Sequence, residues 1–447
     1  MTHVLLGRVT SFCRNRLVKN VAILASGTAA AQVLTVASSP ILTRIYGPEA
    51  FGLLALFTAI MLVATAISTL DYHMAVVLPE EEGDAANLVA LSMLIVLGIS
   101  ALSFVVVALA GDWFIRLTSS PELRAWLWLL PLGVLFAGSY KVFDYWSTRN
   151  QQFRRLSGSR VLQSATTIAV QLVAALGGVF AGGLIFGQVV GQSVASAVLG
   201  RQIWTDAGHT LRAHLQFQRA RQLALRYARF PKFSAPQHLV FHASQAAIPF
   251  FLAFFFSPAV VGFYALAYRI LKVPANLLGK TTEQVFYPHL TGVHRQTPEK
   301  LYVVVMQATT TLAFLVAGPT LIIVVFGPQL FSLAFGADWA QAGSISRYLV
   351  VYLAISLVNQ PSVVLSRILG LQHVHFLVTL ARGVLVIVAI VLAALILENS
   401  TLAIAYYAGI GTLFHVCFLL YICRACALLS HSRRFSTNMN RSGDDIG

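Results

Sequence analysis

Long apolar stretches recur along the whole chain, separated by short segments that contain proline, glycine and charged residues. Each stretch runs for about twenty residues, the length that a helix needs to cross the hydrocarbon core of a bilayer. The strands of a membrane β-barrel would instead alternate apolar and polar residues over roughly ten residues. The pattern therefore predicts twelve membrane-spanning helices, with cores at residues 20–42, 52–77, 88–110, 125–146, 160–180, 184–204, 233–256, 260–287, 302–326, 344–366, 375–397 and 401–423.

The composition supports a membrane protein and excludes a soluble enzyme. Of the 447 residues, 57% are hydrophobic and 11% are charged, whereas soluble domains carry about 25% charged residues. The short segments between the apolar stretches leave no room for the extramembrane domain of a single-span receptor. We therefore expect an all-α polytopic membrane protein whose first helix is retained and not cleaved as a signal peptide.

The distribution of the basic residues predicts which side of the membrane each segment faces. The net charge is +15, which in a soluble protein would suggest nucleic acid as a partner. Here Lys and Arg gather in alternate segments, and an orientation with both termini in the cytoplasm places 22 of them inside and 3 outside. This bias is typical of cytoplasmic loops, so no nucleic-acid partner is expected.

The two halves of the chain share a weak internal repeat. At an offset of 210 residues, Gly52 aligns with Gly262 and Ala55 with Ala265. Six spans in each half predict two lobes related by a pseudo-two-fold axis along the membrane normal. Further matches, after the third and ninth and after the fourth and tenth predicted spans, are Gly111 with Gly327 and Arg149 with Arg367.

These observations predict four regions. Residues 1–208 form an N-terminal lobe, residues 209–232 a basic cytoplasmic linker, residues 233–430 a C-terminal lobe and residues 431–447 a cytoplasmic tail. The arginines of the linker favour an amphipathic segment close to anionic lipid headgroups. A solvated loop that only sets the topology fits the sequence equally well.

One predicted span carries a polar stripe. Arg269, Lys272, Asn276, Lys280 and Glu283 follow one another at steps of three or four residues, which keeps them on one face of a helix over roughly 21 Å. A charged side chain at the bilayer centre costs about 2.5 to 3.5 kcal/mol, so this face is expected to line a polar cavity. Its cations outnumber its single carboxylate, and the cavity should attract anions such as phosphate.

Other polar residues within the spans are candidates for substrate binding, ion coupling or gating. Arg382 adds a cation to the expected cavity. Asp71 is either a carboxylate that carries a proton between two conformations or a group that packs against Arg382 or a hydroxyl. Lys141 and Asp144 are three residues apart and favour a structural ion pair, with a gating role as the alternative. Glu283 either neutralises Lys280 or takes part in gating.

Catalytic and metal-binding motifs are not found in the sequence. There is no G-x-S-x-G, no Walker loop and no H-E-x-x-H, so no catalytic residue, no cofactor and no internal ATPase is expected. His238 and His242 lie one turn apart without a carboxylate or Cys at ligand spacing and predict a helix interface. The lone pair Cys423 and Cys426 predicts packing, and neither a zinc site nor a disulfide framework is expected.

Four segments of the chain carry a resemblance to a known family. They are T-R-I-Y-G-P-E-A-F-G-L-L-A-L-F (43–57), D-Y-W-S-T-R-N-Q-Q-F (144–153), G-F-Y-A-L-A-Y-R-I-L-K-V-P (262–274) and Q-V-F-Y-P (284–288). They resemble the polysaccharide-export flippases of the multidrug, oligosaccharidyl-lipid and polysaccharide exporter superfamily. The similarity follows the same order along nearly the whole chain, which makes it more specific than any one motif.

The resemblance implies two six-helix lobes that form a V around a central cavity. It implies transport of an undecaprenyl-diphosphate-linked oligosaccharide to the outer leaflet of a bacterial inner membrane, with a polysaccharide polymerase and its chain-length machinery as partners. Arg269 and Lys272 occupy the motif whose cations would receive the diphosphate or acidic sugars. The sequence departs from the family near Asp71, where many relatives carry an arginine.

Three other functions are alternatives to this interpretation. A drug exporter of the same fold would be expected to have an acidic and aromatic cavity. A flippase for peptidoglycan precursors would be expected to carry two additional spans. A scaffold protein for a polymerase would not need a wet cationic stripe. The sequence does not name the sugar, the coupling ion or the polysaccharide that is made.

Overall fold

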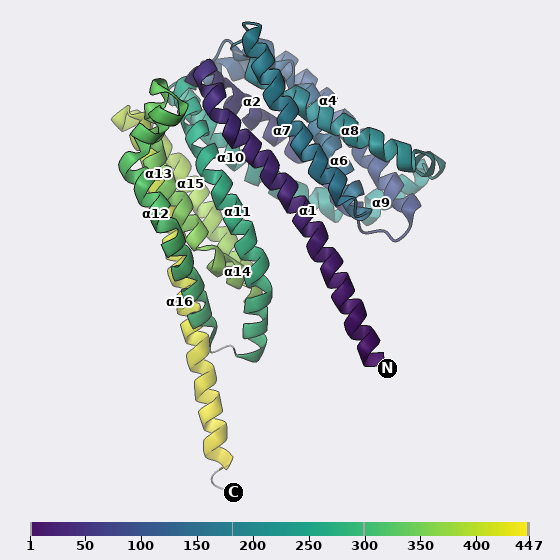
Figure 1. Cartoon of the computed structure of the whole chain (residues 1–447), viewed down its shortest axis with the longest axis vertical. Coiled ribbons are helices and arrows are strands. Elements are labelled where there is room, and N and C mark those ends of the chain that lie inside the picture. Colours follow the sequence, from purple (N-terminus) through teal and green to yellow (C-terminus); the bar gives the residue numbers. More distant parts are fainter. Residues whose placement is uncertain (1, 181, 298–299, 445–447) are drawn as a thin grey trace. The chain divides into compact units, whose positions relative to one another are not determined.

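The computed structural model describes residues 2–180, 182–297 and 300–444, and over these residues the chain folds only into helices and turns (Figure 1). Contacts divide it into two compact units, Met1–Gly262 and Phe263–Gly447. The prediction of an all-α membrane protein is confirmed, and large apolar side chains such as Leu109, Phe314 and Leu333 are at least 78% exposed. Exposed apolar faces of this extent are suited to lipid.

The first unit contains ten helices in its described part and the start of an eleventh. Its central packing joins α4 to α6, α6 to α8, and α7 to both α1 and α8, while α10 packs against α2. The bounds are α1 (Thr2–Ile45), α2 (Pro48–Ile67), α3 (Tyr72–Ala75), α4 (Glu82–Thr118), α5 (Leu123–Leu127), α6 (Leu130–Arg149), α7 (Phe153–Leu176), α8 (Gly183–Ala213), α9 (Phe217–Arg226) and α10 (Ala235–Phe255), with a π-helical turn at Phe230–Ser234.

The second unit is built from the remaining helices. In it α12 packs against α13, and α16 packs against both α13 and α15. The bounds are α11 (Pro258–Gln296), which begins in the first unit, α12 (Leu301–Phe335), α13 (Ala340–Val358), α14 (Gln360–Ile368), α15 (Gln372–Leu397) and α16 (Ser400–Asp444), with a 3-10 turn at Ala337–Trp339.

Every predicted span overlaps one of these helices, and nine segments of the described chain are long and apolar enough to cross a membrane. The predicted spans that fall on α6, α7 and α11 are not among the nine. Each of these helices carries several Lys or Arg residues, which lower its mean hydropathy. The count of twelve spans therefore stays a prediction.

Two predicted spans are interrupted. The span at 52–77 ends as α2 at Ile67, and the chain then turns through Leu70 and Asp71, both at positive φ, before the short α3. The span at 344–366 breaks at Asn359, because Pro361 follows at the start of α14 and cannot continue the preceding helix. Hydropathy averaged over a span does not reveal either break, because the polar residues at each break are few and apolar residues flank them.

The repeat aligns residues that meet in space. A Cβ atom on Gly52 in α2 would overlap the carbonyl oxygen of Pro258, and a Cβ atom on Gly262 in α11 would overlap that of Pro48. The contact is reciprocal and both pairs obey the offset of 210 residues. The match of Gly111 with Gly327 needs a correction, because both glycines lie inside helices that continue beyond the predicted spans, and only Gly327 packs closely against another helix.

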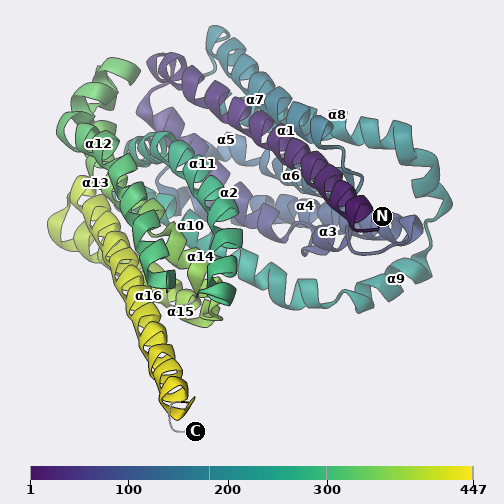
Figure 2. The same ribbon diagram turned by 60° about the horizontal axis from the view of Figure 1, so that its bottom comes forward.

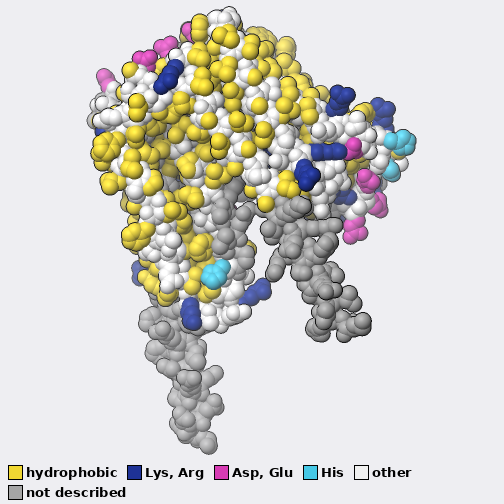
Figure 3. Space-filling model, in the orientation of Figure 1, with side chains coloured by type: hydrophobic (Ala, Val, Ile, Leu, Met, Phe, Trp, Pro, Cys, Tyr) yellow, Lys and Arg dark blue, Asp and Glu magenta, His cyan; other side chains and the backbone are white. Residues whose placement is uncertain are grey.

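The charged surface of the first unit gathers where several helix ends meet. Arg155 pairs with Asp206 at 2.5 Å, Arg219 pairs with Asp84 at 2.6 Å, and Arg149 donates to the carbonyl oxygen of Glu80 at 3.1 Å. Figure 3 shows acidic, basic and histidine side chains together at the side where Figure 1 places α9, next to a large apolar face. This region is a charged surface that borders a large apolar face.

Candidate functional site

The predicted polar stripe lies on one continuous helix. The helix α11 runs through Pro274 without a break, so the spacing of three and four residues keeps the stripe on one side. Lys272 is half-buried and Asn276 is exposed. The side chain of Lys280 lies outside the described residues, so its role remains a prediction.

Lys272 lies within a group of aromatic side chains. Its Nζ donates a hydrogen bond to the Tyr268 hydroxyl at 2.9 Å and lies 4.6 Å from the centre of the same ring. Tyr268 stacks on Tyr264 at 5.6 Å between ring centres, and Tyr264 meets Tyr407 edge to face at 6.2 Å. The rings hold the ammonium group in a mostly apolar environment, where a cation–π contact is worth about 2 kcal/mol or more.

Arg382 reaches the same aromatic group from α15. Its guanidinium donates to the Tyr352 hydroxyl and to His415 Nε2, each at 3.2 Å. Tyr352 packs on Tyr407 at 5.5 Å between ring centres. The structure thus brings two predicted cations to one assembly, which we call the tyrosine cluster: Tyr264, Tyr268, Lys272, Tyr352, Arg382, Tyr407 and His415.

The tyrosine cluster depends on helices that are distant in sequence. Its members come from α11, α13, α15 and α16, and Tyr264, Tyr352 and Tyr407 are each at most 8% exposed. Sequence analysis found both cations through their improbable position in apolar segments. It missed the tyrosines and His415, because such residues are common in membrane helices and only the packing of four helices makes them a group.

The other stripe residues have different surroundings. Arg269 is half-buried, and within the described part of the chain its guanidinium has no hydrogen-bond or ion-pair partner. Glu283 pairs with Arg367 of α14. The expected neutralisation of Glu283 by Lys280 is therefore replaced by an ion pair with another helix, which a spacing rule within one helix cannot reveal.

Asp71 lies in the first unit, at the break after α2. Its φ of 60° is in the left-handed region, which Asp tolerates better than most residues. The side chain is buried and accepts a hydrogen bond from His238 Nδ1 of α10 at 2.7 Å. The alternatives offered for Asp71 named Arg382 or a hydroxyl as its partner, and the observed partner is this histidine.

A lysine stands close to the same carboxylate. The Nζ of Lys141 donates to the carbonyl oxygen of Thr65 at 2.7 Å, at the end of α2, and lies near enough to Asp71 for their charges to interact. His73, which is 5% exposed, hydrogen-bonds Thr69 at 2.7 Å. Asp71, Lys141 and His238 therefore lie together where α2, α6 and α10 meet, with Asp71 buried and the other two half-buried, and we call them the Asp71 group.

The expected ion pair between Lys141 and Asp144 is not formed. Asp144 pairs instead with Arg160 of α7 at 3.3 Å, and Arg160 also donates to Thr28 at 2.6 Å. Residues three apart on a helix are neighbours on its surface, but Lys141 is directed toward Thr65 and Asp144 toward α7. Neighbouring helices therefore determine the partners of both residues.

The chemistry of these two sites differs. The tyrosine cluster offers cations that can bind phosphate or carboxylate oxygens, and broad aromatic faces against which an apolar or sugar ring can pack. The Asp71 group offers a buried carboxylate with a histidine partner that can gain or lose a proton.

Comparison with known protein families gives a match over most of the chain. The profile of the family described as polysaccharide biosynthesis protein matches residues 41–344, which is more than half of the chain. No protein with a curated description matches the sequence.

Solved structures show the same fold at low sequence identity. An inward-facing multidrug resistance MATE transporter of the MOP superfamily is 14% identical, with a TM-score of 0.65, over 91% of this chain and 95% of that one. The lipid II flippase MurJ in an inward closed conformation is 12% identical, with a TM-score of 0.66, over 93% of both chains. A MOP transporter from Pyrococcus furiosus, described as having a binding pocket of reverse polarity, is 16% identical, with a TM-score of 0.55, over 92% and 96%.

Proposed function

Because the chain belongs to the family of polysaccharide biosynthesis proteins, we propose that it is a flippase for lipid-linked oligosaccharides. The proposed substrate is an undecaprenyl-diphosphate-linked repeat unit, which moves from the cytoplasmic to the periplasmic leaflet of a bacterial inner membrane by alternating access. A diphosphate head group cannot cross hydrocarbon unaided, so the transporter must supply cations along its path.

The observation that carries this proposal is the position of Lys272 and Arg382 in the tyrosine cluster. Both cations are held by hydroxyl or imidazole groups and have no carboxylate partner in the described chain, so no acidic side chain competes with an anionic ligand for them. Arg269, Asn276 and Lys280 on α11 extend the proposed binding surface. The aromatic rings beside the cations are suited to the sugar.

This observation also favours a flippase over a drug exporter. The solved MATE and MurJ structures resemble the chain almost equally, with TM-scores of 0.65 and 0.66, so the fold does not select between their functions. A transporter for cationic drugs would be expected to hold carboxylates at its binding surface. In the described part of the second unit, the carboxylate on the stripe, Glu283, is already engaged by Arg367.

The Asp71 group is the proposed coupling site. A proton taken up by Asp71 would remove the charge that holds His238, so protonation would favour a conformation in which α2 and α10 separate. The ion pairs Asp144–Arg160 and Glu283–Arg367 are proposed as gating contacts that differ between the two facing states.

The proposed function is tested by the location of lipid-linked sugar. In a strain that lacks the gene, sugar on the carrier lipid should stay in the inner leaflet and be released by the wild-type protein. Lys272→Gln and Arg382→Gln should each lower the rate about tenfold or more, because a hydrogen bond to a charged group contributes about 1.5 to 3 kcal/mol. The matched control is Arg424→Gln, an exposed arginine on α16. An unchanged distribution of the lipid in the deletion strain would contradict the proposal.

The coupling role is tested separately with Asp71→Asn. Asn tolerates the left-handed conformation and can still hydrogen-bond His238, so the fold should be kept while proton exchange is lost. In proteoliposomes, the wild-type rate should respond to an imposed pH gradient and the rate of the variant should not. Asp112→Asn, at an exposed ion pair with Arg124, is the control. An equal response of Asp71→Asn and wild type would exclude Asp71 as the coupling carboxylate.

A further inference from the structure

An apolar cavity lies in the first unit, apart from both sites described above. It has a volume of about 560 Å³ and opens between α4, α6 and α8. Its wall consists mainly of carbon atoms, contributed by Ala90 and Met93 of α4, Phe143 and Trp146 of α6, and Trp204 of α8 among others. The volume falls within the usual range of small-molecule sites, about 300 to 1,000 Å³. A polar head group would find almost no partner on this wall.

The rim of the cavity is cationic. Arg201 of α8 lines the opening and is exposed. Arg212, three turns further along α8, places its guanidinium 4.4 Å from the centre of the Trp204 ring. Trp204 is 51% exposed, and tryptophan prefers the boundary between hydrocarbon and headgroups. The cavity is lined by Arg201 and by the exposed indole of Trp204, on which Arg212 stacks. An apolar chamber beside two arginines matches the division of a phospholipid into acyl chain and anionic head.

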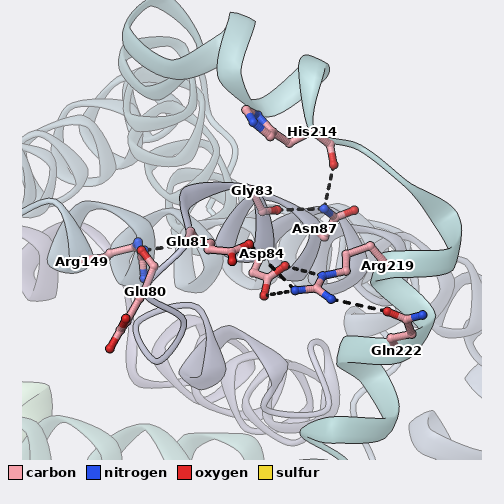
Figure 4. A network of polar contacts seen from close by, with 9 residues as sticks. All are labelled: Glu80, Glu81, Gly83, Asp84, Asn87, Arg149, His214, Arg219 and Gln222. Carbon is pink, nitrogen blue, oxygen red and sulfur yellow. Dashed lines mark hydrogen bonds and ion pairs between the residues drawn. The ribbon is translucent and has the colours of Figure 1, made fainter.

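The segment after α8 closes one side of the cavity and is fixed in place by α4. Leu211 and Leu215 contribute to the wall. Figure 4 shows that Asn87 holds this segment by donating to the carbonyl oxygen of His214, at 2.7 Å. Asn87 also accepts a hydrogen bond from the backbone N–H of Gln216 at 2.9 Å. Hydrogen bonds from α4 therefore hold part of the cavity wall in place.

The next helix presents a second surface suited to a membrane. Figure 2 shows that α9 turns back from α8 and runs along the end of α4. Leu223 is buried against the first unit, whereas Phe217 and Leu225 are 84% and 70% exposed, and Arg221, between them in sequence, is also exposed. Apolar and basic residues on one outward face are typical of a helix that lies in the headgroup region.

We propose that this cavity binds one acyl chain of an anionic glycerophospholipid, with the phosphate between Arg201 and Arg212. The apolar wall suits an acyl chain, which free phosphate lacks. The two cations beside it suit a head group with a net negative charge, which a zwitterionic lipid lacks. The exposed face of α9 rests on the same lipid surface. The lipid acts as a structural ligand of the first unit and is distinct from the transported substrate.

The test uses the full-length protein in nanodiscs and a photoreactive phosphatidylglycerol with its reactive group at the end of one acyl chain. Labelled peptides should map to residues 86–93, 143–146 or 200–215. Photoreactive phosphatidylcholine should label them much less. Arg201→Gln and Arg212→Gln should each reduce the labelling about fivefold, since each cation near an anionic surface contributes about 1 kcal/mol. Arg124→Gln, at the exposed ion pair with Asp112 and outside the cavity, should leave it unchanged.

Further variants and competitors separate the possible occupants. Ala90→Trp fills the chamber and should abolish labelling of these peptides, and the wild-type map remains decisive if this variant does not fold. Equal labelling by the two phospholipids, or labelling that maps elsewhere, would overturn the proposal. It would also be overturned if undecaprenyl phosphate displaced the probe more effectively than unlabelled phosphatidylglycerol, because the cavity would then be a substrate site.

Discussion

The groups around His415 determine which ring nitrogen carries its proton. Arg382 can only donate, so His415 Nε2 must accept the bond at 3.2 Å. The proton of a neutral imidazole is then on Nδ1, which lies 3.3 Å from the side-chain amide of Asn359. The amide must turn its oxygen toward Nδ1, since the oxygen and nitrogen positions of an amide are assigned from hydrogen bonding. This orientation also gives a donor to Asn359 Oδ1, which is otherwise a buried acceptor without a partner.

This assignment makes a prediction at Asn359. Asn359→Leu removes the acceptor and should lower the free energy of unfolding by about 1 to 3 kcal/mol, the cost of leaving a buried donor unpaired. Asn359→Asp keeps an acceptor at the same place and should retain more of the stability. Equilibrium unfolding in mixed micelles measures both variants. If Asp destabilised the protein as much as Leu, Asn359 would be acting as the donor and the assigned tautomer would be wrong.

At the scale of single residues, the sequence identified charged groups better than their partners. Lys272, Arg382 and Asp71 were identified because a charge in an apolar span is costly and needs a reason. Their partners Tyr268, His415 and His238 lie on the same or other helices, and only for Tyr268 is the separation short enough for a spacing rule to find it. The left-handed turn at Asp71 was also not predicted, because positive φ leaves no mark on hydropathy.

At the scale of elements, the crossing of α2 with the start of α11 depends on two glycines. Gly52→Ala or Gly262→Ala would force a methyl group into a backbone carbonyl of the other helix. Each should lower the free energy of unfolding by about 1 to 3 kcal/mol, as overpacking does, and the two effects should be similar because the contact is reciprocal. Gly98→Ala on α4, where a Cβ atom meets nothing within 4 Å, is the control and should be neutral or stabilising. Unequal losses would argue against a symmetric contact.

A second element-scale prediction concerns α9. Arg219 binds both carboxylate oxygens of Asp84, at 2.6 and 2.8 Å, and this carboxylate raises the pKa of the guanidinium above its ordinary value. Asp84 is 6% exposed, so Arg219→Gln leaves a buried charge with a weaker partner. Hydrogen exchange of residues 217–226 should become about tenfold faster or more, as loss of a charge-assisted bond predicts.

Matched variants separate the ion pair from general disruption of α9. Gln222→Ala removes only the exposed contact of Gln222 with Arg219, at 3.5 Å, and should leave hydrogen exchange unchanged. The exchanged pair Asp84→Arg with Arg219→Asp should restore part of the protection. If hydrogen exchange were equally fast in Arg219→Gln, Gln222→Ala and the exchanged pair, the ion pair would not be what holds α9 to α4. Apolar packing around Leu223 would then hold it.

For the whole molecule, the membrane fold was predictable and the number of crossings was not established by hydropathy. The recurring apolar stretches and the low share of charged residues are properties of the whole chain. A wrong interpretation of one position therefore does not alter them. Of the three helices that fall short, α6 carries the candidate residues Lys141 and Asp144, α11 carries Arg269 and Lys272, and α7 carries Arg160, the partner of Asp144. Charged residues lower the mean hydropathy of these helices, so a span that carries them is harder to recognise from hydropathy alone.

The topology gives the last prediction, which is tested by labelling single cysteines in a background without the native ones. With both termini in the cytoplasm and all twelve helices crossing, Glu122→Cys, Val179→Cys and Ser257→Cys should react with an impermeant maleimide in intact cells. Asn150→Cys and Thr297→Cys should react only after permeabilisation. These positions flank α6, α7 and α11, so each of the doubtful crossings separates one reactive from one protected site. Equal reactivity at 122 and 150 would show that α6 does not cross, and the charge bias of 22 to 3 would then need a different topology to account for it.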